Sequence, residues 1–118
     1  MAEEIAASAG DCVRVAPATT MTQLGALAKR ARLFVGSDTG PLHLAVAVGT
    51  PSVSLHGTSL AAQTCAYGPG NRSIQVRYDN SPGKRRTDDD SAMRAITVDQ
   101  VANVCCEVLD SAQQARSA

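Results

Sequence analysis

The sequence predicts an α/β fold with a small parallel sheet and flanking helices. Strand-like and helix-like segments alternate along most of the chain, and the run Leu33–Pro51 joins a buried strand to an apolar helix through one tight polar turn. Strands that alternate with helices form parallel sheets through right-handed crossovers. The 118 residues are enough for one domain with a single core.

The composition narrows the class of function. The formal net charge is zero and aromatic residues make up only 3% of the chain, with no Trp, which argues against binding of nucleic-acid phosphates or stacking on bases. The apolar share of 44% is typical of a soluble globular domain. No run reaches the roughly 20 apolar residues of a membrane span. The acidic start lacks the basic region of a secretory signal, so we expect a cytoplasmic protein.

The four cysteines form no metal-site pattern. No CxxC pair occurs among Cys12, Cys65, Cys105 and Cys106, so their spacing matches no zinc motif. We expect buried or half-buried free thiols in a reducing compartment, with the adjacent Cys105 and Cys106 pointing about 100° apart on a helix. Neither a metal ion nor another cofactor is expected.

The N-terminal part of the chain is predicted to form a helix, a strand and a second helix. Residues 2–9 are rich in Ala and Glu and precede Gly10, a residue type that commonly ends helices. Residues 12–15 are a short strand candidate. Thr20 and Gln23 have the spacing of a capping box, which predicts that a helix begins there.

The middle of the chain contains the strand–turn–helix. Leu33–Gly36 is predicted to be a strand, and Pro41 suits a first helical turn because its missing N–H is not needed there. The residues that follow are apolar on nearly all sides of a helix, which predicts that this helix is largely buried. Gly49 and Pro51 end it.

Two further strands are expected after this helix. Ser52–His56 is the first, and Gly57–Asn71 is predicted to be a long loop because it contains Gly-Pro-Gly. Ser73–Tyr78 alternates between apolar and polar residues and is the second strand. Residues 79–95 are polar.

The last predicted element is a helix capped by Thr97, with Gln100 completing a second capping box. We predict one domain over residues 1–118, with a core from about 12 to 110 and a frayed tail over 111–118. A sheet of only four strands leaves two edges that need cover, which indicates a part of something larger or a protein that self-associates.

The polar turn after Gly36 is the candidate functional site. At the carboxyl end of a strand and facing a helix N-terminus, it has the position at which open α/β sheets bind anionic ligands. Asp38 could accept hydrogen bonds from helix N–H groups or ligand hydroxyls, while Thr39 and Gly40 would offer backbone N–H groups and His43 a donor or a charge. Gly40 has no Cβ, so a diphosphate could approach closely. No nucleophile–base pair is present, which favours binding over bond breaking. These residues are also ordinary capping and turn residues.

A family resemblance makes this site more specific. The run Asp38–Ala45 reads Asp-Thr-Gly-Pro-Leu-His-Leu-Ala, and with Gly49–Pro51 and a strand ending in Gly57-Thr58 it resembles the heptosyltransferase family of glycosyltransferases. The similarity covers roughly residues 12–110, and further matching segments are Thr20–Val35, Tyr67–Pro69 and Ile96–Val101. The family has the GT-B fold, in which two Rossmann-like domains face a cleft. The resemblance implies that this chain is like the last part of the C-terminal, Rossmann-like domain.

The resemblance also implies roles for individual residues. Asp38 would hydrogen-bond hydroxyls of the donor sugar, Thr39 and Gly40 would meet the diphosphate through backbone N–H groups, and His43 would lie near the same phosphates. Further candidate ligand residues are Ser37, Gly57 and Thr58. The donor would be ADP-heptose or a similar nucleotide sugar, the acceptor a lipopolysaccharide core, and the location the cytoplasm, at the inner face of the bacterial inner membrane. No metal is used in such a reaction.

The resemblance leaves part of an enzyme unassigned. No segment matches the acceptor domain or its catalytic base, so the chain is expected to carry no catalytic residue and to be inactive by itself. The alternative is a stand-alone, non-catalytic α/β module that binds a phosphorylated ligand or self-associates through its sheet edges.

Two features depart from the family pattern. The family usually has an aromatic residue and a proline around the end of the Gly-Thr strand, whereas this chain reads Leu55-His56-Gly57-Thr58-Ser59. For His56, a structural or neutral role is favoured over one facing solvent or ligand. Residues 79–92 carry the triplets Lys84–Arg86 and Asp88–Asp90. This segment is predicted to be a solvated surface, with contact to an acceptor phosphate through Lys84, Arg85 and Arg86 as the alternative.

Overall fold

The structure, a computed structural model, describes residues 1–57, 70–76 and 91–117. Three parallel strands form one sheet in the order β1-β2-β3, so the predicted α/β class with a small parallel sheet is confirmed. The strands are β1 (Phe34–Ser37), β2 (Ser52–Leu55) and β3 (Arg72–Ile74). The helices are α1 (Ala2–Ala9), the 3-10 helix η1 (Gly10–Cys12), α2 (Met21–Arg30), α3 (Gly40–Ala47), α5 (Ser91–Arg94) and α6 (Val98–Ser117).

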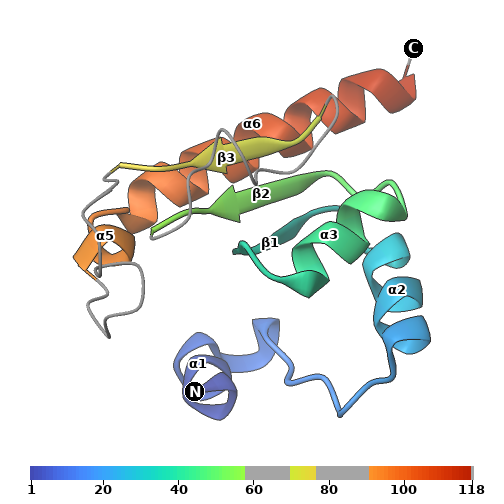
Figure 1. Ribbon diagram of the computed structural model, residues 1–118, viewed down its shortest axis with the longest axis horizontal. Helices are drawn as coiled ribbons and strands as arrows, with labels where there is room; N and C mark the ends of the chain where they lie inside the picture. Colours follow the sequence, from blue (N-terminus) through green and yellow to red (C-terminus); the bar gives the residue numbers. More distant parts are fainter. Residues whose placement is uncertain (58–69, 77–90, 118) are drawn as a thin grey trace, which may run out of the picture.

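Helices cover both faces of the sheet. Helix α3 connects β1 to β2 and contacts both strands, with α2 packed against it, whereas α6 contacts β2 and β3 (Figure 1). Alternate residues of a strand point to opposite faces. Val53 and Leu55 accordingly join the α6 cluster, and Ser52, Ser54 and His56 face the other side. The sheet is therefore buried on both faces at its central strand, β2.

The α6 face holds the main apolar cluster. Val53, Ile74 and Val108 are buried together, and half-buried side chains surround them. These surrounding residues are Leu33, Leu55, Ile96, Val101, Val104 and Cys105. Val35 points to this same face but is 43% exposed, because α6 lies over β2 and β3 and leaves β1 uncovered.

The α3 face is built from small side chains and polar bonds. Leu42 and Ala45 of α3 are fully buried there, and the serines of β2 leave room for the helix to lie close to the sheet. Thr50 fixes α2 in place, since its hydroxyl donates a 2.7 Å hydrogen bond to the carbonyl of Ala28. The position of α3, and with it the candidate site, is set by this face.

The local signals at helix ends are confirmed. Thr20 and Gln23 make both bonds of a capping box at the start of α2, and Thr97 and Gln100 do the same before α6. Pro41 lies in the first turn of α3. Beyond the end of that helix, Gly49 has a φ of 85°, a conformation that favours glycine.

Some element predictions were wrong. Residues 12–15 form no strand: Cys12 ends η1, and all four residues are exposed with no strand beside them, so their extended preference has no partner. Strand β3 begins at Arg72 and stops at Ile74, well short of Tyr78, which lies outside the described residues. Helix α5 lies in a stretch we expected only to be polar.

The two ends of the chain also differ from expectation. Helix α6 continues to Ser117, so the residues from 111 that we expected to fray are helical. Its inner side still touches the fold there, since Ala112 and Gln113 line a pocket with Arg32. Helix α1 forms over residues 2–9 as predicted, but none of its residues is buried and it lies away from the sheet (Figure 1).

We predict that replacing Leu42 by Ala lowers the free energy of unfolding by about 3 kcal/mol, because the side chain is fully buried and its loss leaves a cavity between α3 and the sheet. Leu27→Ala is the matched control on α2, where the side chain is 52% exposed and the change should be within about 0.5 kcal/mol. Urea unfolding followed by circular dichroism measures both. Equal losses for the two variants would contradict the assigned core.

Candidate functional site

The candidate site lies where β1 and β2 both end. The register pairs Ser37 with Leu55, so the next residues, Asp38 and His56, come side by side at the carboxyl edge of the sheet. Paired residues of neighbouring strands point to the same face. Both side chains therefore belong to the α3 face, on which His43 also lies.

Asp38 and His43 are paired in this turn, and the pair is ionic when the ring is protonated. The Nε2 of His43 lies 3.0 Å from Oδ1 of Asp38, within hydrogen-bond distance. The Asp38 side chain is only 17% exposed, whereas that of His43 is 55% exposed. The Asp38 side chain is therefore mostly enclosed by the fold and contacts an imidazole ring about half of whose surface is open to solvent.

The start of α3 offers a backbone donor. The N–H groups of Leu42 and His43 both donate to the carbonyl of Thr39, and proline at position 41 has no N–H. Thr39 is the N-cap, but its hydroxyl turns back to the carbonyl of Ser37 at 3.4 Å and does not cap the helix. Within the described part of the chain, the N–H of Gly40 makes no hydrogen bond. It is a donor at the positive end of a helix dipole.

Gly40 has space in front of it. A Cβ built at this position would meet no atom within 4 Å, and the residue is exposed. Gly40 has no positive φ, and no atom of the described fold beyond its chain neighbours requires glycine here, although Pro41 disfavours a helical residue with a Cβ before it. An anion could approach this backbone closely, which is the property we expected of Gly40.

Gly57 is different, although it lies at the same edge. It is buried, and an added Cβ would lie 3.3 Å from the backbone nitrogen of Met93 in α5. The need for glycine here comes from the packing of α5 on the end of β2, which accounts for Gly57 without a ligand. Ser37 is exposed at the end of β1, and Thr58 lies outside the described residues.

His56 is fully buried, which favours a structural role. Its Nε2 is 2.9 Å from the hydroxyl of Ser54, and its backbone N–H donates to the carbonyl of Ile74. Burial lowers the pKa of His56 below its ordinary value of 6.5; the Asp38 carboxylate opposes this shift, and His43 adds to it. Of the alternatives for His56, exposure to solvent is wrong. The position of His56 beside Asp38 can be inferred only when the pairing of β1 with β2 is continued by one residue beyond Ser37 and Leu55.

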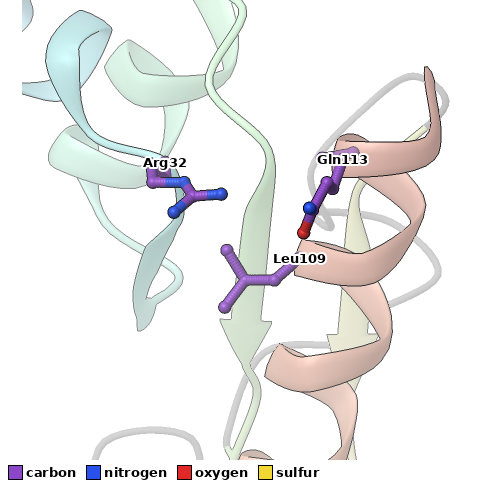
Figure 2. A pocket seen from close by; sticks show the side chains of 4 residues that line it. Arg32, Leu109 and Gln113 are labelled. Carbon is purple, nitrogen blue, oxygen red and sulfur yellow. The ribbon is translucent and has the colours of Figure 1, made fainter. Parts of the chain in front are cut away.

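A pocket on the described surface lies elsewhere. It is lined by Arg32, Leu109, Ala112 and Gln113, between α6 and the segment leading into β1 (Figure 2). Arg32 precedes β1 whereas Asp38 follows it, so this pocket is at the amino end of the strands, opposite to the candidate site. Nothing connects it to the ion pair.

No metal centre is formed by the described residues, in which no group of three His, Cys, Asp or Glu side chains comes together. The expectation of buried or half-buried thiols holds for Cys105 alone of the described cysteines, since Cys12 and Cys106 are exposed. Burial, and secondly the neighbouring Cys106, raises the pKa of Cys105. Cys65 and the triplet Lys84–Arg86 lie outside the described residues.

A parallel sheet with helices on both faces and a polar turn at the carboxyl edge is the architecture of a Rossmann-like domain. The family model of glycosyltransferase family 9 (heptosyltransferase) matches residues 1–93, and the chain belongs to this family. The match begins before residue 12, where we expected the resemblance to start, and does not include α6. The whole candidate site lies within it.

Two curated relatives match shorter stretches. Lipopolysaccharide heptosyltransferase 3 of Escherichia coli is 50% identical over 40 residues, which are 34% of this chain and 12% of the relative. Lipopolysaccharide heptosyltransferase 1 of Campylobacter coli is 36% identical over 56 residues, which are 48% of this chain and 16% of the relative. The matched stretches are thus small parts of both relatives. No solved structure was found to match the chain.

In the described ranges, no helix has the length and apolar character that crossing a membrane requires.

The burial of His56 predicts a loss of stability in acid. Because its pKa in the folded state is lowered, the unfolded chain binds more protons, and stability rises with pH. The contribution is complete above the unfolded pKa of 6.5 and is lost as the pH falls below it towards the folded pKa. One such proton changes stability by at most about 1.4 kcal/mol per pH unit.

Urea unfolding at a series of pH values, with the variant His56→Gln as the reference, measures this contribution. Glutamine is neutral at every pH, so the curve of the variant should be flatter below about pH 6.5. Asp38 and His43 are present in both proteins. Parallel curves would show that burial of His56 does not disfavour its charged form.

Proposed function

We propose that this chain binds the sugar and diphosphate of a nucleotide-sugar donor, ADP-heptose or a close analogue, for a heptosyltransferase-family enzyme. The observation that carries the proposal is the open N–H of Gly40 next to the Asp38–His43 pair, inside a segment that the family model matches. A helix N-terminus with an unbonded N–H suits a phosphate, and a carboxylate beside it suits sugar hydroxyls.

Each residue has a distinct part in this proposal. The N–H of Gly40, together with that of Thr39, donates to phosphate oxygens, and the missing Cβ lets them come close. His43 turns its exposed ring edge towards the same phosphates. Asp38 accepts from sugar hydroxyls and holds His43, whose pairing offsets the negative charge that a diphosphate would otherwise meet.

The proposed reaction is transfer of a heptose to a lipopolysaccharide core acceptor, with inversion at the sugar. In it, the turn stabilises the negative charge that develops on the departing nucleoside diphosphate. Removing one preorganised donor of this kind typically costs about 3 kcal/mol in a transition state. The base that activates the acceptor is assigned to a part of the enzyme that this chain does not match, which agrees with the small share of each relative that the chain covers.

Replacement of Gly40 by Ala tests the proposal. The new methyl group meets no atom beyond its chain neighbours, but Pro41 follows and disfavours helical backbone at a preceding residue that has a Cβ, so we expect a modest loss of stability, which urea unfolding measures. The same methyl group blocks the approach of a diphosphate. We expect the affinity for ADP, measured by isothermal titration calorimetry, to fall about tenfold or more.

Gly57→Ala is the matched control, since the same methyl group there meets the backbone of Met93. That variant should lose stability, and any loss of ADP affinity should follow the unfolded fraction. Folded wild-type protein that does not bind ADP, or equal ADP affinity in the wild type and Gly40→Ala, would overturn the proposal.

A further inference from the structure

We propose that His56 is a positioning residue of the candidate site, whose buried neutral ring keeps the Asp38 carboxylate directed towards His43. The first observation is the register, which puts Asp38 and His56 next to each other at the carboxyl edge and on one face of the sheet. This inference gives a role to a residue that the donor-binding proposal does not use. The effect of His56 on donor binding rests on the proposed function, whereas the position of His56 in the fold does not.

The ring of His56 is held in a defined orientation. It is fully buried, and Ser54 is its partner at 2.9 Å. The Ser54 hydroxyl lies 3.4 Å from the carbonyl of Arg72, to which it can donate, and 2.9 Å from Nε2 of His56. Burial of the ring favours its neutral form, because a second proton would place a charge in a buried site.

The charges around His56 come from several elements. Asp38 on the β1–α3 turn and His43 on α3 are the two whose charges act on it. Arg94 of α5, the helix packed at Gly57, is exposed. On the α6 face, Glu107 is paired with Arg72 at 3.2 Å, and Asp99 at the start of α6 is exposed. The charges that shift the pKa of His56 are therefore those of Asp38 and His43.

The protonation state of His56 determines whether the Asp38 carboxylate is attracted to His43 alone or also to His56. A neutral ring brings no charge that competes for the carboxylate, so the ion pair with His43 at 3.0 Å is kept. A protonated His56 would attract Asp38 and repel a protonated His43, which weakens the pair and disturbs the turn that carries Gly40. Phenylalanine would fill a similar volume without this response to acid, so His56→Phe is the natural control.

The ring-proton signals of both histidines, followed by NMR from about pH 8 to 5 without ligand, test the coupling directly. We expect the His43 ring signals to show a step at the pH at which the His56 signals change. This step should be absent in His56→Phe and clearly smaller in Asp38→Asn, which keeps only the direct charge effect between the two rings. A His43 signal without that step, or a step of full size in Asp38→Asn, overturns the inference whether or not His56→Phe folds.

The ADP affinity at about pH 7.5 and 5.5 provides the link to function. The wild type should lose about fivefold more affinity in acid than His56→Phe, and, by linkage, bound ADP should lower the pKa of His56 further. His43 and Asp38 are present in both proteins, so the ratio isolates the effect of His56. Equal pH dependence in the two proteins overturns the inference. A wild type that binds no ADP at either pH overturns the proposed function, while the ligand-free NMR result still decides the role of His56.

Discussion

The candidate site depends on the parallel pairing of β1 with β2. Both strands end at the same edge, and the pairing of Ser37 with Leu55 brings Asp38 and His56 together on the face that α3 covers. A slip of one residue would send one of these side chains to the α6 face, among the apolar side chains around Val53. The register is therefore what turns two residues 18 positions apart into one site.

The packing of α3 adds the second half of the arrangement. The buried Leu42 and Ala45 fix the helix on a surface of serine side chains, and Thr50 ties its far end to α2. With both ends held, the helix presents the N–H of Gly40 and the ring of His43 at a fixed place beside Asp38. Such rigidity in the elements that carry the polar groups is what a preorganised anion site requires.

Local patterns in the sequence predicted the features that depend on neighbouring residues. Both capping boxes follow from side chains within one turn, and they were predicted correctly. The prediction that α3 is largely buried holds for one side of the helix only, since Leu42 and Ala45 are buried but half of its residues are exposed. Residues 12–15 were wrongly predicted to be a strand. A strand forms only beside a partner strand, and the N-terminal segment up to Val15 has no partner strand in the described fold. The four main site residues were found from the sequence, but the 3.0 Å pair that joins two of them, and the position of His56 beside them, depend on register and packing.

The central claim is that the carboxyl edge of the sheet, at the β1–α3 turn, is where a nucleoside diphosphate binds. Mapping ADP-induced changes in the backbone amide signals of the folded chain by NMR tests this most directly. The account predicts the largest changes at Thr39, Gly40 and His43, with little change around Arg32 and Gln113, which line the pocket at the opposite end of the strands. Changes centred on that pocket, with the Gly40 amide unmoved, would contradict it.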